Sequence, residues 1–160
     1  MLPLFFFVCT VRARATILIT HTMLTRFTIT GVAKPKGSMK AFIPKGWNRP
    51  VLTSTNASVK TWEQTIRNVA QDFTEAYTTG PVRVRLRFSL PRPKSLSRQA
   101  SRSHIKRPDV DKLARAALDA LTGILWKDDS QVYSLVASKQ YAAPDQPPHL
   151  VITILTPHDN

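Results

Sequence analysis

The 160-residue chain has little cysteine, few acidic residues and no long apolar run. Its one cysteine, Cys9, has no partner for a disulfide within the chain, and the count excludes a metal site of the cysteine-histidine type. A reducing cytoplasm is the compartment that fits this composition best. No run approaches the roughly 18 to 20 apolar residues that span a bilayer, so we expect no membrane partner.

Acidic residues are scarce, whereas basic residues are abundant. The chain has 10 Asp and Glu against 23 Lys and Arg, which gives a net charge of +13. Such a surplus indicates an anionic partner, and nucleic acid is the commonest one because neutralised phosphates release counterions. We therefore expect the chain to bind nucleic acid.

The first 22 residues look like an extension. Their short apolar run has no basic residue ahead of it and is a poor secretory signal. A period-two pattern over residues 23–31 predicts a strand and a natural domain start. We predict a dispensable extension at 1–22, a domain at 23–156 and a tail at 157–160. The alternative is an extra edge strand at residues 15–20.

The remaining chain alternates between strand and helix patterns. Apolar spacing predicts helices at residues 58–77 and 111–125. Period-two patterns and bounding turn residues predict strands at 82–88, 131–141 and 149–156, and the first of these carries Arg83, Arg85 and Arg87 on its wet face. With 42% apolar residues, the chain suffices for one core. We predict a single α+β domain of order β-α-β-α-β-β, with a small mixed sheet and helices packed on one face.

Half of the ten acidic residues lie between Asp109 and Asp129. Asp109 and Asp111 would point the same way on an extended chain but diverge by about 200° in a helix, so we expect Asp109 to be non-helical. The alternatives are an N-cap role for one of this pair and a turn role for Asp128 and Asp129. Taken together, these carboxylates suit Mg²⁺ or Mn²⁺, which can activate water for phosphodiester hydrolysis.

Arg115 lies one helical turn after Asp111. It could form an ion pair with Asp111 or Asp119, or stabilise charge on a phosphoryl group in the transition state. Sequence reasoning leaves both roles open.

The predicted helix separates the two acidic motifs. Its 15 residues would span about 22 Å, which one metal ion cannot easily bridge. We hypothesise that two copies of the helix pack antiparallel, so that Asp109 and Asp111 of one subunit meet Asp129 of the other. The alternative is that the helix ends early and the chain folds back.

Two acid-free loops, at residues 32–50 and 91–108, carry many of the cations. Candidates for phosphate contacts, which fix register without reading sequence, lie in or next to these loops: Lys34, Lys36, Lys40, Arg102, Lys106, Arg107 and Lys112. Phe42, Trp47 and Tyr141 could wedge between bases, although aromatic residues near loops are more often part of the core.

Residues 107–113 (RPDVDKL) and 117–132 (ALDALTGILWKDDSQV) closely resemble the signature of the RusA-type Holliday-junction resolvases. The resemblance extends over about residues 23–155. It implies a homodimeric, Mg²⁺-dependent endonuclease, often borne by a phage or prophage in a bacterial host. Such an enzyme nicks four-way DNA junctions symmetrically and acts in DNA recombination and repair.

By the same resemblance, the essential acids fall on Asp109, Asp111 and Asp129, with Asp128 beside them. The chain departs from the pattern twice, with Lys112 where Asn is common and Arg115 where a catalytic Lys is usual. Arginine keeps the charge but does not readily give up a proton, so an electrostatic role fits it better than an acid role. Two other functions stay open. One is a catalytically silent nucleic-acid-binding module whose acids are caps and turn residues, and the other is a flap or fork nuclease of similar chemistry.

Overall fold

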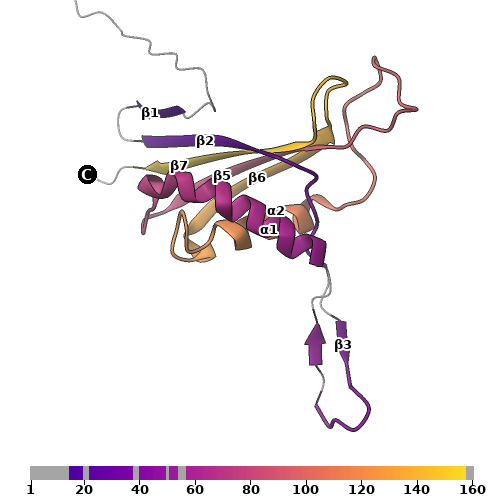
Figure 1. Ribbon diagram of the computed structural model, residues 1–160. Helices are drawn as coiled ribbons and strands as arrows, with labels where there is room; N and C mark the ends of the chain where they lie inside the picture. Colours follow the sequence, from indigo (N-terminus) through magenta and orange to yellow (C-terminus); the bar gives the residue numbers. More distant parts are fainter. Residues whose placement is uncertain (1–14, 20–21, 38–39, 50, 54–56, 158–160) are drawn as a thin grey trace, which may run out of the picture.

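The structure, a computed structural model, describes residues 15–19, 22–37, 40–49, 51–53 and 57–157. The strands are β1 (Ala15–Ile19), β2 (Thr22–Thr30), β3 (Lys40–Phe42), β4 (Val51–Thr53), β5 (Val82–Leu90), β6 (Val132–Tyr141) and β7 (His149–Pro157). The helices are α1 (Ala57–Ala70) and α2 (Val110–Leu121), with short 3₁₀ segments η1 (Gln71–Ala76) and η2 (Asp129–Gln131) (Figure 1).

Five strands form one mixed sheet in the order β1-β2-β7-β5-β6. Only β5 and β6 pair in parallel, and the other neighbours are antiparallel. The predicted order β-α-β-α-β-β is confirmed by β2, α1, β5, α2, β6 and β7. Strands β3 and β4 form a separate hairpin that extends away from the domain (Figure 1).

Strand β1 lies at the edge of the sheet and pairs with β2. This pairing is the edge strand that we considered as the alternative for residues 15–20. Residues 1–14, 20 and 21 of the predicted extension, and residues 158–160 of the predicted tail, lie outside the described residues. No helix in the described part of the chain is long and apolar enough to cross a membrane.

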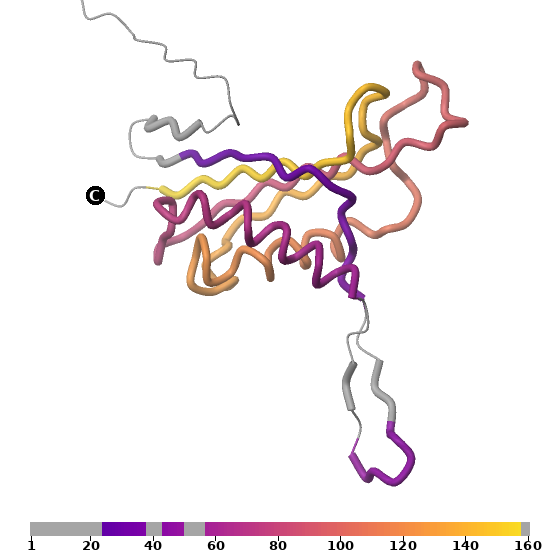
Figure 2. The backbone as a smooth tube through the Cα atoms, in the orientation of Figure 1, coloured from indigo at the N-terminus to yellow at the C-terminus, as the bar shows by residue number. Residues whose placement is uncertain are grey.

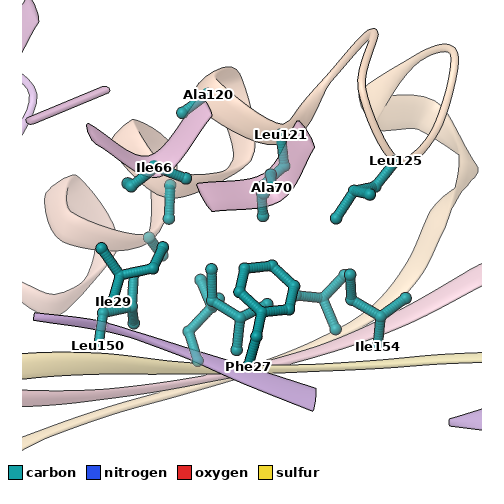
Figure 3. Packing of buried hydrophobic residues seen from close by; sticks show 14 of the residues in the cluster. Phe27, Ile29, Ile66, Ala70, Ala120, Leu121, Leu125, Leu150 and Ile154 are labelled. Atoms are coloured by element: carbon teal, nitrogen blue, oxygen red, sulfur yellow. The ribbon is translucent and has the colours of Figure 1, made fainter. Parts of the chain in front are cut away.

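Both helices pack on the same face of the sheet, as predicted (Figures 1 and 2). Figure 3 shows side chains from β2 and β7 pointing toward α1, α2 and Leu125. The shared core contains Phe27, Ile29, Ile66, Leu86, Phe88, Leu113, Leu121, Leu150, Ile152 and Ile154. Burying one such side chain stabilises the fold by about 1.5 to 3 kcal/mol. Apolar residues therefore recur on the buried side of each helix and strand, and their spacing predicted where these elements lie.

Helix α2 ends at Leu121, four residues earlier than predicted. Gly123 adopts a positive φ of 79°, and its amide donates to the Trp126 carbonyl at 2.7 Å, so the chain turns back. The prediction failed because Leu125 is fully buried and keeps the apolar spacing, although it lies in a turn. The alternative of an early helix end is therefore correct.

Candidate active site

Asp109 is the N-cap residue of α2, with extended φ and ψ of −72° and 141°. The prediction of a non-helical Asp109 is confirmed. Its side chain makes no capping hydrogen bond, and Oδ2 instead lies 3.1 Å from Lys112 Nζ. The hydrogen bond and charge of Lys112 lower the pKa of Asp109, and Arg107 contributes further. This half-exposed carboxylate is therefore ionised at neutral pH, as a metal ligand has to be.

Asp111 lies in the first turn of α2 and is exposed. In the described part of the chain it forms no ion pair. Arg115, one turn later, is also exposed and pairs with neither Asp111 nor Asp119. The Asp119 carboxylate binds Lys36 Nζ instead. The ion-pair role considered for Arg115 is therefore not present.

A pocket of about 570 Å³ lies beside Asp109. Its polar lining consists of Lys34, His104, Arg107, Asp109 and Lys112, and its apolar lining includes Leu90 and Pro91 from the end of β5. Three positively charged side chains thus line the same pocket as one carboxylate. This arrangement suits a phosphate group that approaches a divalent metal ion bound by Asp109.

Lys139 on β6 fixes the loop that enters this pocket. Its ammonium donates to the carbonyls of Lys106 and Pro108 at 2.6 and 2.7 Å. The Tyr141 amide donates to the Arg102 carbonyl at 2.7 Å and anchors the same loop further back. These contacts place Asp109 beside the end of β6.

His104 was not among the residues chosen from the sequence. It is half-buried, its ring centroid lies 4.6 Å from that of Tyr141, and its Nδ1 is buried with no hydrogen-bond partner in the described part of the chain. Burial, followed by the charge of Lys139, lowers the pKa of His104 below 6.5, so the ring is neutral at pH 7. The only sequence signal was a lone histidine five residues before Asp109.

The second acidic motif begins with a cap. Asp128 Oδ1 accepts a hydrogen bond from the Ser130 amide at 2.8 Å, while Gln131 Oε1 accepts from the Asp128 amide at 2.9 Å. Hydrogen bonds from Ser130 lower the pKa of Asp128. The Gln131 side chain also donates to the carbonyls of Thr78 and Gly80. The turn role considered for Asp128 is therefore present.

Only one oxygen of the Asp129 carboxylate accepts hydrogen bonds within the described residues. Its Oδ1 accepts hydrogen bonds from the Thr122 hydroxyl and from Trp126 Nε1, the latter at 3.1 Å. Trp126 is fully buried, so its position is fixed by the core. Among the described residues no group bonds Oδ2, which leaves one oxygen of a positioned carboxylate available as a ligand.

The two acidic motifs lie near opposite ends of β6. Gln131 contacts residues just before β5, whereas Lys139 contacts Pro108. The seven residue steps from Val132 to Lys139 span about 23 Å at about 3.3 Å per residue. Within the described residues no three His, Cys, Asp or Glu side chains gather closely enough to hold a metal ion. The expected separation is present, although α2 has 12 residues rather than the 15 predicted.

The candidate phosphate-contacting residues fall into distinct settings. Lys34, Arg107 and Lys112 line the pocket, and Arg102 and Lys106 are exposed on the loop before it. Lys36 follows two lining residues but is not part of the lining, and its ammonium pairs with Asp119 and approaches Glu63 at 3.8 Å. The side chain of Lys40 lies outside the described residues. Their contacts with phosphates stay predictions.

The three aromatic candidates also differ. Trp47 is exposed on the hairpin loop, Tyr141 is buried against the His104 ring, and the side chain of Phe42 lies outside the described residues. Of the two candidates whose side chains the structure describes, only Trp47 has a ring that faces solvent.

Comparison with known proteins places these features in a family. The family described as endodeoxyribonuclease RusA matches residues 33–155, which include both acidic motifs and most of the pocket. The uncharacterized protein YqaN of Bacillus subtilis (strain 168) is 31% identical over 131 residues, covering 73% of this chain and 87% of YqaN. The chain therefore belongs to the RusA endodeoxyribonuclease family.

Proposed function

We propose that the chain is a Mg²⁺-dependent endonuclease that resolves four-way DNA junctions by paired symmetric nicks. The observation that carries this proposal is the ionised Asp109 in a pocket with three cations, together with Asp129, which is held in place with one oxygen free. This activity would serve DNA recombination and repair in the cytoplasm of a bacterial host, as part of a phage or prophage. Membership in the RusA family supports the proposal.

The donor set fits a hard divalent cation. Asp109, Asp111 and Asp129 supply carboxylate oxygens, the ligands that Mg²⁺ and Mn²⁺ prefer. When bound, the metal ion would activate water and stabilise the leaving oxygen. Because one chain keeps these carboxylates apart, we propose that a homodimer combines Asp109 and Asp111 of one subunit with Asp129 of the other.

The neighbouring cations would act on the substrate. Lys34, Arg107 and Lys112 neutralise a phosphate that enters the pocket, and Arg115, exposed and free of acidic partners in the described region, stabilises charge that develops on the phosphoryl group. His104, neutral at pH 7, offers a proton acceptor at the pocket wall.

A broader DNA-contacting surface lies on the face of the sheet opposite the helices. Arg26, Arg83, Arg85 and Arg87 line a groove of about 350 Å³ there. None of the ten acidic residues lies in the five strands, and none of the four guanidinium groups forms an ion pair within the described residues. Arginines without acidic partners along a groove suit the phosphate backbone of DNA.

A synthetic four-way junction tests the proposal. With Mg²⁺, the wild-type protein should produce paired symmetric nicks, and Asp111→Asn should abolish them while leaving junction binding in place. Asp145→Asn, the same chemical change in an exposed loop residue, should retain cleavage. Calorimetric Mn²⁺ binding without DNA should weaken in Asp111→Asn only. Binding without cleavage would indicate the silent binding module, and equal cleavage of flaps or forks would indicate the other nuclease.

A further inference from the structure

Ile105 is the most exposed of the large apolar side chains in the described residues. It is 89% exposed, and the next, Ile43, is 63% exposed. One exposed aliphatic residue is ordinary on a protein surface and indicates nothing by itself. Ile105, however, lies four residues before Asp109, in the loop between β5 and α2 that projects beyond one end of the sheet (Figure 1). Its setting therefore decides whether it has a function.

The chain just before Ile105 is fixed to the end of β6. Ser103 forms an antiparallel bridge with Gln140. The ring of His104 packs against that of Tyr141, with their centroids 4.6 Å apart. The residue before Ile105 thus turns its side chain toward the protein, whereas Ile105 itself leaves its side chain in solvent.

The chain just after Ile105 is fixed as well. The Lys139 ammonium donates to the carbonyls of Lys106 and Pro108, at 2.6 and 2.7 Å. Anchors on both sides therefore hold the backbone of Ile105 in place. Because the loop is already ordered, a ligand that covers this side chain does not have to offset the entropy of ordering the loop.

Positive charge surrounds Ile105. Arg102, Lys106 and Arg107 are all exposed, and the whole loop contains no acidic residue. Arg107 also lines the pocket beside Asp109. An apolar side chain among cations suits a partner that is anionic and also offers apolar surface. DNA has both properties, because its backbone is charged and side chains can enter between the faces of its bases.

We propose that Ile105 inserts into the base stack of DNA at a branch point, beside the phosphate that enters the pocket of Asp109. This deepens the proposed function and rests on it for the position of the phosphate. Isoleucine is one of the side chains that enter between base steps in proteins that kink DNA. Four residue steps keep the Cα atoms of Ile105 and Asp109 within about 14 Å of each other. At about 3.4 Å per base step, the insertion lies within about four steps of the phosphate.

A branch point is the place where this insertion is most favourable. In continuous duplex DNA, an inserted side chain has to unstack two base pairs, which costs free energy. Where helices meet at a branch point, stacking is already interrupted, so Ile105 is buried without that full cost. Contacts to phosphates are available on linear and branched DNA alike. Ile105 therefore supplies a preference for branched DNA that the surrounding cations do not.

Binding in EDTA tests the insertion without cleavage. Ile105→Ala should bind a labelled four-way junction about tenfold more weakly than the wild-type protein, because less apolar surface is buried, and should bind a linear duplex equally well. Ile105→Leu should keep the wild-type preference. Ile43→Ala, the same change in the hairpin loop, should alter neither affinity. An unchanged junction affinity in Ile105→Ala, or equal losses for junction and duplex, would overturn the proposal.

Fluorescence of 2-aminopurine reports the insertion directly, because this base is brighter when it is unstacked. With the probe at the branch point, saturating wild-type protein should raise the fluorescence more than saturating Ile105→Ala. A probe in the middle of one arm is the control and should respond equally to both proteins. Equal signals at the branch point would show that Ile105 stays outside the stack, and the proposal would fail.

The two proposals can fail separately. If the wild-type protein unstacks the branch point through Ile105 but does not cleave with Mg²⁺, the nuclease function fails and the insertion stands. If the protein cleaves and Ile105→Ala keeps the full preference for junctions, the insertion fails and the nuclease function stands. A wild-type protein that does not bind junctions would overturn both.

Discussion

Replacing Arg83, Arg85 and Arg87 together by glutamine should flatten the salt dependence of DNA binding. The three side chains project from alternate positions of β5 onto the uncovered face of the sheet. Successive arginines are about 6.7 Å apart along the strand, so each guanidinium group can contact a separate phosphate of one DNA backbone.

The magnitude follows from counterion release. Each neutralised phosphate of duplex DNA contributes about 0.9 to the slope of log affinity against log salt, so three contacts contribute about 2.7. Between about 50 and 200 mM salt, three such contacts account for an affinity loss of about 40-fold in the wild-type protein. The affinity of the triple variant should therefore fall about 40-fold less than that of the wild-type protein over the same range.

The assay is fluorescence anisotropy with a labelled four-way junction in EDTA, which separates binding from metal-dependent cleavage. A triple variant Lys60→Gln, Lys94→Gln and Arg98→Gln removes the same charge from exposed positions outside the sheet. The reasoning is refuted if the slope of the β5 variant falls no more than that of this control, because net charge alone would then explain the effect.

Three further outcomes follow from single contacts. Gln131→Leu removes four hydrogen bonds around η2 and should lower the unfolding free energy, measured by urea titration, by about 2 to 4 kcal/mol. A loss below about 0.5 kcal/mol would show that these hydrogen bonds do not stabilise the turn. An NMR titration should give His104 a pKa below 6.5 in the folded protein, so the unfolding free energy should decline as the pH falls from 6.5 toward that pKa. Lys139→Gln should raise the pKa of His104, because it removes a nearby positive charge. An unchanged pKa in this variant would exclude the charge effect. Trp126→Phe removes the N–H group that donates to Asp129 and should slow junction cleavage about tenfold with unchanged binding. Full activity would show that this hydrogen bond is not needed to position the carboxylate.

Much of the fold could be predicted because its core elements are long and amphipathic. Strand β5 alternates apolar residues with arginines, and the buried and exposed positions follow that alternation. Helix α2 was predicted too long because burial of Leu125 in a turn produces the same spacing as a helix face. The position of β7 between β2 and β5 was not predicted, since pairing partners far apart in sequence leave no local pattern.

The candidate site could be predicted only where local geometry decides it. The spacing of Asp109 and Asp111 indicated an extended Asp109, and the structure confirms it. The partner of Lys36 is Asp119 on α2, and the burial of His104 depends on Tyr141. Both contacts arise from tertiary packing, so the sequence could not separate Lys36 from the other lysines or single out His104.

The arginine face and the acidic motifs occupy different parts of the fold. Arg83, Arg85 and Arg87 lie on the uncovered face of the sheet, whereas Asp109 precedes α2 and Asp129 begins η2, next to opposite ends of β6. Under the proposed function, the arginines would hold DNA along the sheet, while the carboxylates would reach phosphates near its ends. This separation keeps the few acids of a strongly basic chain from neutralising the arginines that would bind DNA.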